Sequence, residues 1–320
     1  MAGRNRPVAE LFGAACDGDR AALARLLSLI ERGGDEAREV ARLVHPLTGS
    51  AHLVGLTGAP GSGKSTLTSA TIAHLRGMQT EVAVLAIDPS SPFTGGAILG
   101  DRVRMQDHAT DPGVFIRSMA TRGHLGGLSL ATPEAARLLD AVGRPWIIVE
   151  TVGVGQVEVE IAGKADTTVV VVNPGWGDSV QANKAGLMEI ADIFVINKAD
   201  RKGVADTRRD LEQMLELSEL ADGAWRPPIL PVVATSGEGV AEYWQAVVDH
   251  RATIEASGEL ARRRQFRIGE ELREIIARRL EQRAREVATG DRWAQLQLDV
   301  AEHRLDPWTA ADEMLKTVGA

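Results

Sequence analysis

Residues 52–66 read H-L-V-G-L-T-G-A-P-G-S-G-K-S-T, and Gly58 to Ser65 within them match the phosphate-loop pattern G-x-x-x-x-G-K-[ST] in full. An apolar run precedes the loop and a helix-like apolar pattern follows it, which is the strand–loop–helix context that this motif requires. Glycines let successive backbone N–H groups turn toward phosphate oxygens, and the positive end of the following helix faces the same point. Lys64 is expected to reach the β- and γ-phosphates, and the Ser65 hydroxyl to ligate Mg²⁺. The stretch therefore predicts a nucleotide site formed by Gly58, Ala59, Pro60, Gly61, Ser62, Gly63, Lys64, Ser65 and Thr66.

A second motif, N-K-A-D at residues 197–200, ends an apolar run and predicts the base. The Asp200 carboxylate can accept the N1–H and the exocyclic amino group of guanine, whereas adenine offers neither donor there. Leaving such a carboxylate unpaired costs about 1–3 kcal/mol, so a preference for guanine follows. Asn197 is expected to brace the loop, and the Lys198 stem to cover the base face. Thr235 and the two residues after it follow the next apolar run and can close over the base through backbone N–H groups.

Carboxylates at further strand ends indicate a magnesium site. Residues 146–153 read W-I-I-V-E-T-V-G, so Glu150 can hold Mg²⁺ through water and the Gly153 N–H can sense a γ-phosphate. Usual GTPases have Asp at the position of Glu150. Asp88 ends an apolar run, and Asp101 follows a glycine-rich segment. Each of the two can ligate Mg²⁺, directly or through water, or can instead form a turn or cap a helix.

Two features leave alternatives open. Residues 174–184 read P-G-W-G-D-S-V-Q-A-N-K after a buried-strand pattern. Either Asp178 or Ser179 caps a helix there, or the segment is a third mobile loop that contacts the nucleotide or a protein partner. Several arginines near the glycine-rich segments are candidates for charge stabilisation, and nothing in the sequence chooses among Arg102, Arg104, Arg117 and Arg122.

Alternating strand and helix patterns predict an α/β fold, namely a mostly parallel P-loop NTPase sheet covered by helices. Continuous β-branched runs such as residues 169–172 are typical of strands that are buried on both faces. The predicted strands are residues 53–57, 82–88, 146–150, 168–173, 193–197 and 229–233.

Three regions are expected: an N-terminal helical segment over residues 1–50, a P-loop GTPase domain over 51–257 and a C-terminal helical arm over 258–320. Glutamates are interspersed among the arginines of the arm and the whole chain is acidic, which favours a solvated helix over a nucleic-acid-binding one. One apolar stripe runs along it, and it must pack on the core domain or on a second subunit. The stripe consists of Ile268, Leu272, Ile276 and Leu280.

Composition limits the partners and the compartment. The net charge of −8 argues against nucleic acid or an anionic membrane as the main partner. The single cysteine, Cys16, rules out an internal disulfide framework, fits a reducing compartment and is expected to be a small buried residue. No apolar run is long enough for a transmembrane helix, and the N-terminus shows no secretory pattern, so a cytoplasmic protein is expected.

Four stretches, taken in order, resemble the MeaB/ArgK family of P-loop GTPases, to which the human methylmalonic aciduria type A protein belongs. They read D-P-S-S-P-F-T-G-G-A-I-L-G-D-R at residues 88–102, F-I-R-S-M-A-T-R-G-H-L-G-G-L at 115–128, V-E-T-V-G-V-G-Q at 149–156 and G-L-M-E-I-A-D-I-F-V-I-N-K-A-D at 186–200. The resemblance extends over nearly the whole chain. It implies a GTPase that hydrolyses GTP to GDP and phosphate, is homodimeric through its C-terminal arm, and is related to nickel-insertion and signal-recognition GTPases.

The resemblance also implies a chaperone of an adenosylcobalamin-dependent acyl-CoA mutase, with methylmalonyl-CoA mutase as the expected partner. Such a chaperone gates loading of the cofactor from an adenosyltransferase, protects the mutase and supports its reactivation, and does not itself need to bind cobalamin. The family pattern assigns Mg²⁺ contacts to Ser65, Asp88, Asp101 and Glu150. It makes residues 174–184 a switch III loop, whose coupling residues are Asp178, Gln181 and Lys184.

Relatives often have Ser-Ala where this chain has Val233 and Ala234, so only a backbone role at the base is expected for these two residues. The first rival function is an ATP- or GTP-dependent kinase of a lysine/arginine/ornithine transport system, which the guanine motif disfavours. The second is a metallochaperone GTPase, which normally needs a His- or Cys-rich tract that this sequence lacks.

Overall fold

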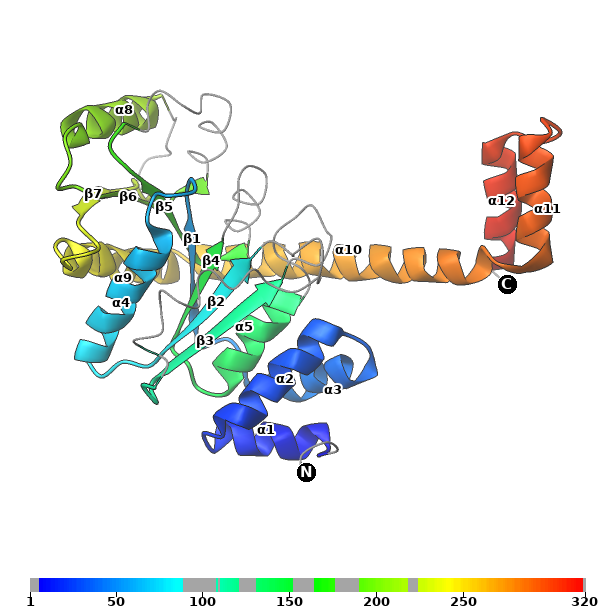
Figure 1. Ribbon diagram of the computed structural model, residues 1–320, viewed down its shortest axis with the longest axis horizontal. Coiled ribbons are helices and arrows are strands. Elements are labelled where there is room, and N and C mark those ends of the chain that lie inside the picture. Colours follow the sequence, from blue (N-terminus) through cyan, green and yellow to red (C-terminus); the bar gives the residue numbers. More distant parts are fainter. Residues whose placement is uncertain are drawn as a thin grey trace. The chain divides into compact units, whose positions relative to one another are not determined.

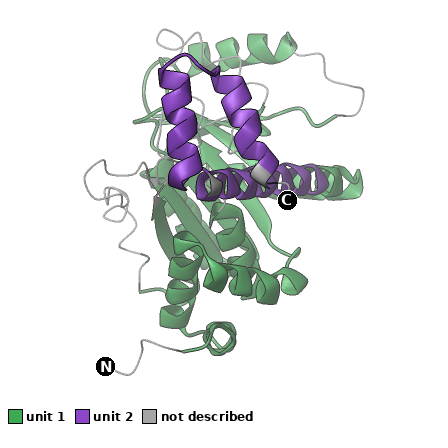
Figure 2. Ribbon diagram, turned by 90° about the vertical axis from the view of Figure 1, so that its right-hand side faces the viewer, with its two compact units in different colours: residues 1–263 green, residues 264–320 purple. Residues whose placement is uncertain are grey.

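The computed structural model describes residues 6–88, 108, 110–120, 131–151, 164–175, 190–217 and 224–318. The chain divides into two compact units, residues 1–263 and 264–320 (Figure 2). The nucleotide motifs all belong to the first unit.

The first unit is built on a seven-stranded parallel sheet in the order β3-β2-β4-β1-β5-β6-β7 (Figure 1). The predicted parallel α/β sheet is confirmed, and each of the six expected strands is present with its ends shifted by at most one residue. The strands are β1 His52–Thr57, β2 Val82–Asp88, β3 Val114–Ala120, β4 Trp146–Thr151, β5 Thr167–Val172, β6 Ile193–Asn197 and β7 Ile229–Val232.

Strand β3 was missed by the sequence analysis, because Arg117 and Ser118 interrupt its apolar pattern. It is one of the two edge strands of the sheet, and an edge strand tolerates such residues. Arg117 donates two hydrogen bonds to the Glu31 carboxylate, at 3.0 and 2.8 Å, and one to Ser28 at 3.0 Å. This arginine, one of four candidates for charge stabilisation, therefore forms an ion pair with a covering helix; the other three lie outside the described residues.

Helices cover both faces of the sheet. On one face, α4 (Lys64–Gly77) and α9 (Val240–Ala256) share a core with alternate residues of the central strands. On the other face, α5 (Ala131–Ala141) packs over β2, β3 and β4, and α8 (Val204–Glu216) packs over β5 and β6. All six residues of β5 are buried, as the β-branched run predicted.

The predicted N-terminal helices are present as α1 (Val8–Cys16), α2 (Arg20–Arg32) and α3 (Asp35–Val44), and a 3₁₀ turn follows at His45–Leu47. They share one apolar core with α5 and the sheet. The expectation for Cys16 was wrong, because this residue is exposed. Val8, Leu11 and Ala15 form the buried face of α1, and Cys16 follows Ala15 by about 100° of helical rotation.

The second unit contains most of α10 (Glu259–Val287), together with α11 (Gly290–Ala301) and α12 (Pro307–Val318). Leu296, Ala310 and Met314 form a small core between α11 and α12. The predicted stripe on α10 is half-exposed, at 52% for Ile268, 54% for Leu272, 56% for Ile276 and 58% for Leu280. No helix among the described residues combines the length and the apolar character needed to cross a membrane.

Candidate nucleotide-binding site

The phosphate loop lies between the end of β1 and the start of α4, as the motif predicts. Gly58 has φ 140°, and a Cβ there would lie 2.1 Å from the carbonyl oxygen of Val171 on β5. Gly63 has φ 93°, and a Cβ there would lie 2.3 Å from Asn197 Nδ2. At both positions a side chain is excluded by contact with a neighbouring strand, β5 or β6, and glycine is also favoured by the positive φ angle of the turn. Gly61, with φ 77° and open space around it, is required by the turn alone.

Lys64 begins α4, and its side chain folds back over the loop. The ammonium donates hydrogen bonds to the carbonyl oxygens of Gly58 at 2.5 Å and Ala59 at 3.2 Å. The side chain is buried, so its charge acts at close range and with little screening by solvent. The loop thus presents a positive charge beside the amino end of a helix, an arrangement that favours phosphate.

Glu150 on β4 lies next to the phosphate loop because of strand register, which pairs it with Leu56 of β1. Its carboxylate is completely buried and accepts a 2.6 Å hydrogen bond from the Ser65 hydroxyl. A second hydrogen bond, 2.7 Å long, comes from Thr68. A serine hydroxyl and a buried carboxylate are hard oxygen donors, so these residues fit a Mg²⁺ ion. Thr68 was missed by the sequence analysis, although its position one helical turn after Ser65 places both residues on one face of α4.

The other predicted metal ligands are only partly described. Asp88 is the last residue of β2, and the register there pairs Ala86 with Glu150. The backbone of Asp88 therefore lies at the carboxyl-terminal ends of the strands, as Glu150 does. Its side chain lies outside the described part of the structure, as does all of Asp101. The same holds for the expected γ-phosphate sensor and coupling residues, which are Gly153, Asp178, Gln181 and Lys184.

Asn197 joins the phosphate loop to the base motif. Its Nδ2 donates to the Ser62 carbonyl oxygen at 2.9 Å, and its Oδ1 accepts from the backbone N–H of Lys198 at 2.8 Å and of Ala234 at 3.2 Å. Lys198 takes a left-handed conformation with φ 58°, and its ammonium donates to the Gly61 carbonyl oxygen at 2.6 Å. Asn197 therefore braces the phosphate loop as expected, and it also holds the segment after β7 through Ala234.

The loop after β7 is held by its own backbone. The N–H of Val233 donates to the Glu238 carbonyl oxygen at 2.9 Å, and the N–H of Ala234 donates to Asn197. These two groups therefore shape the loop, whereas Asp200 and Thr235 are exposed beside it. Contact of Asp200 or Thr235 with a base stays a prediction.

A family model described as "Methylmalonyl Co-A mutase-associated GTPase MeaB" matches residues 23–289. The chain belongs to the MeaB family. Membership in a GTPase family implies guanine-nucleotide binding, in agreement with the N-K-A-D motif, and the predicted family resemblance is confirmed.

Relatives of this MeaB-family chain include proteins from all three domains of life. A Pyrococcus abyssi protein named as a GTPase is 50% identical over 303 residues, 94% of each chain. The GTPase ArgK of Escherichia coli is 40% identical over 263 residues, 80% of each chain. The mitochondrial methylmalonic aciduria type A homolog of Mus musculus is 36% identical over 280 residues, which cover 81% of this chain and 67% of the mouse protein.

Among solved structures, one described as a LAO/AO transport system kinase matches this MeaB-family chain along the full length of both chains. The TM-score is 0.72 and the sequence identity is 27%. This match supports the P-loop NTPase-like fold.

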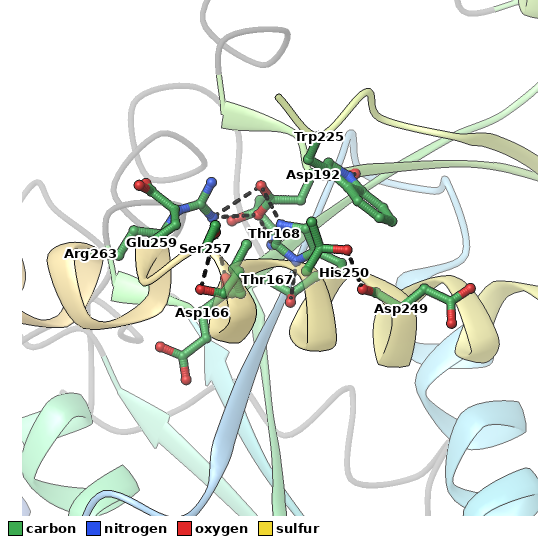
Figure 3. Close-up of polar contacts among 12 residues, drawn as sticks. Asp166, Thr167, Thr168, Asp192, Trp225, Asp249, His250, Ser257, Glu259 and Arg263 are labelled. Carbon is green, nitrogen blue, oxygen red and sulfur yellow. Dashed lines mark hydrogen bonds and ion pairs between the residues drawn. The ribbon is translucent and has the colours of Figure 1, made fainter. Parts of the chain in front are cut away.

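A second cluster of polar residues lies at the amino-terminal ends of the strands, opposite the phosphate loop (Figure 3). The Thr167 hydroxyl, at the start of β5, lies 2.7 Å from His52 Nε2 and 2.7 Å from His250 Nδ1. His250 Nε2 lies 3.2 Å from Asp192, and the Arg263 guanidinium lies 3.0 and 3.1 Å from the two Asp192 oxygens. The cluster joins β1, β5, α9 and α10. It lies where the strands begin, whereas the phosphate loop follows the end of β1, so the cluster is not part of the nucleotide site.

The charge of Asp192 is stabilised where it lies. Burial by itself acts to raise the pKa of this carboxyl. His250, Arg263 and the N–H of Thr168, which donates at 2.8 Å, together outweigh burial and hold the pKa below its usual value. Sequence analysis missed the cluster because its members are spread from residue 52 to residue 263 without a local motif.

Proposed function

We propose that this MeaB-family protein hydrolyses GTP to GDP and phosphate with Mg²⁺, and that the cycle gates cofactor loading into an adenosylcobalamin-dependent acyl-CoA mutase. The observation that carries the proposal is the contact of Asn197 with the phosphate loop, which holds this loop beside the guanine motif, as a single nucleotide site would require. The family description and the name of the mouse relative support methylmalonyl-CoA mutase as the partner. Protection and reactivation of the mutase belong to the same proposal.

The proposed site residues divide the chemistry among them. Lys64 places its charge against the β- and γ-phosphates, and the backbone of the loop orients them. Ser65, Glu150, Asp88 and Asp101 would hold Mg²⁺. When bound, the ion would neutralise charge that develops between the β- and γ-phosphates. Asp200 would accept the hydrogen bonds that select guanine.

Topology supports a switch that a protein partner can read. The segments that carry Asp101, Gly153 and Asp178 leave the sheet directly after β2, β4 and β5. These strands flank β1 in the order β2-β4-β1-β5, so all three segments start beside the phosphate loop. Loss of the γ-phosphate would change their contacts, and a mutase that reads the change at Asp178, Gln181 and Lys184 must in turn alter nucleotide affinity.

We also propose that the protein forms a homodimer, in which the apolar stripe of α10 contacts the second copy. It acts beside the adenosyltransferase without binding cobalamin itself. A cytoplasmic location stays a prediction, based on the single cysteine and the absence of an apolar run long enough to span a membrane.

Steady-state GTP turnover tests the enzymatic part. The Lys64→Ala variant should hydrolyse GTP about a hundred- to a thousandfold more slowly than the parent chain, because it removes the charge nearest to the transferred phosphoryl group. Lys202→Ala, which changes an exposed lysine, should keep the parent rate. Equal rates for Lys64→Ala and the parent chain would remove Lys64 from this role.

Mixing the purified protein with a cognate mutase tests the coupling. We expect the mutase to bind and to change the GTP turnover rate, and we expect GTP hydrolysis to be needed for transfer of adenosylcobalamin from the adenosyltransferase to the mutase. A non-hydrolysable GTP analogue should block the transfer. The coupling is refuted if the mutase neither binds nor alters turnover.

The rival function is that of a transport system kinase, the description given to the similar solved structure. A kinase would transfer the γ-phosphate to an amino-acid-binding protein, whereas the proposed GTPase transfers it to water. Incubation with γ-labelled nucleotide separates the two outcomes, because label on the binding protein would support the kinase.

A further inference from the structure

Thr68 contacts the one buried carboxylate that the nucleotide site contains among the described residues. It lies on α4, one helical turn after Ser65, and neither its side chain nor that of Glu150 is exposed. Its hydroxyl donates to Glu150 Oε2 at 2.7 Å, while Ser65 donates to Oε1 at 2.6 Å. Each oxygen of the carboxylate therefore accepts a hydrogen bond from a different hydroxyl, and the two contacts together restrain the orientation of the carboxylate.

The two hydroxyls have different tasks. Ser65 belongs to the phosphate-loop motif, and its oxygen is the one expected to ligate Mg²⁺. Thr68 lies one turn farther along α4, outside that motif, and it contacts Oε2, the carboxylate oxygen that is not paired with Ser65. Thr68 can therefore keep the carboxylate oriented both before and after the metal binds.

The identity of residue 150 gives Thr68 a specific purpose. Usual GTPases have Asp at this position, and Glu has one more methylene and one more rotatable bond. A longer side chain loses more conformational freedom when it is ordered, so it needs an additional contact to present its carboxylate in one orientation. The short bond from Thr68 is such a contact, and hydrogen bonds to a charged acceptor are among the stronger ones in proteins.

From this geometry we infer that Thr68 is a positioning residue, which orients the Glu150 carboxylate toward the Mg²⁺ bound at Ser65. The inference rests on the proposed Mg²⁺-dependent nucleotide site. It assigns Thr68 a role in metal affinity and none in contact with the base or the phosphates.

The experiment compares Thr68→Val, which keeps the shape of the side chain and removes its hydroxyl, with Thr68→Ser, which keeps the hydroxyl. Thr71→Val is the matched control. Thr71 is equally buried on α4, and its hydroxyl donates at 2.7 Å to the Leu67 carbonyl oxygen in its own helix. Release of fluorescent GDP from the full chain is followed at increasing Mg²⁺ concentrations, and GDP affinity is measured separately in EDTA.

The midpoint is the Mg²⁺ concentration at which the effect on the GDP release rate is half-maximal. We expect Thr68→Val to raise this midpoint about three- to tenfold, because a hydrogen bond to a charged group is lost. GDP affinity in EDTA should stay at the parent value. Thr68→Ser should lie within about twofold of the parent midpoint. Thr71→Val should leave the midpoint unchanged even where it lowers stability to the same extent.

Equal Mg²⁺ midpoints for Thr68→Val and Thr71→Val would overturn the inference. If the valine variants do not fold, Thr68→Ala and Thr71→Ala provide the same comparison. In a Glu150→Gln background, removal of the Thr68 hydroxyl should shift the midpoint by less than twofold, and a full shift there would also refute the role of Thr68. A parent chain whose GDP release is insensitive to Mg²⁺ would instead refute the magnesium site of the proposed function, and the inference with it.

Discussion

Asn197 shows how one side chain can connect separate motifs. Its amide nitrogen contacts the phosphate loop, and its oxygen accepts hydrogen bonds from the base motif and from the loop after β7. Its approach also explains Gly63, since any Cβ at that position would collide with the Asn197 side chain. Residues 63 and 197 are thus coupled by a steric contact, which no local pattern reveals.

Asp200→Asn tests the base at the same scale. The amide that replaces the carboxylate cannot accept both guanine donors, so the preference for GTP over ATP should fall about tenfold or more. Competition of each nucleotide against fluorescent GDP measures this ratio. Asp206→Asn, which changes an exposed carboxylate near the start of α8, should keep the parent ratio. An unchanged ratio in Asp200→Asn would count against the base contact.

At the scale of elements, the cluster around Asp192 fastens the start of α10 to the sheet. Arg263 contacts Asp192 and also Glu259, one turn earlier on α10, at 3.2 Å. Trp225 donates to the Asp192 carbonyl oxygen at 2.7 Å, and its ring lies 4.9 Å from the His250 ring. The cluster therefore connects the segments before β6 and β7 with two helices.

Asp192→Asn should lower the free energy of unfolding by about 2 kcal/mol at pH 7, because it weakens hydrogen bonds made to a charged acceptor. The pKa of Asp192 is lowered in the folded chain, so the stability that it contributes is present above the unfolded-state pKa of about 3.9. That contribution is lost as the pH falls through the lower, folded pKa. The difference between the parent chain and the variant should therefore narrow below about pH 4.

Urea unfolding at several pH values measures this difference. Asp249→Asn is the control, because Asp249 is an exposed carboxylate on α9. Its effect should be small and nearly independent of pH. A difference between the parent and Asp192→Asn that persists at low pH would show that the charge of Asp192 is not the source of the stability.

For the whole molecule, the exposed stripe on α10 predicts assembly. Large apolar side chains at four-residue spacing form a continuous surface along one side of the helix. Exposed apolar surfaces of this kind mark protein interaction sites in soluble proteins. A second copy of the chain is the partner that the family resemblance implies.

Leu272→Glu should raise the dissociation constant of the dimer about ten- to a hundredfold, since removing one buried leucine costs about 1.5–3 kcal/mol. Sedimentation at a series of protein concentrations measures the constant. Gln282→Glu adds the same charge on another side of α10 and should leave the dimer intact. The stripe is not the dimer surface if Leu272→Glu associates as strongly as the parent chain.

The sequence by itself determined the sheet and the phosphate loop. A phosphate loop depends on backbone conformations that neighbouring residues dictate, and a strand buried on both faces shows as a continuous apolar run. Six of the seven strands followed from such runs, and β3 did not because an edge strand carries polar residues. The guanine motif was also local, at the end of β6.

Only the tertiary structure decided which of these residues meet. Glu150 and Thr68 are 82 residues apart, and their contact depends on the register of β4 against β1. Thr167 lies between two histidines that come from the start of β1 and from α9. Such contacts arise because strand order and register bring distant residues together at one end of the strands. The spacing of apolar residues along the chain does not encode that order.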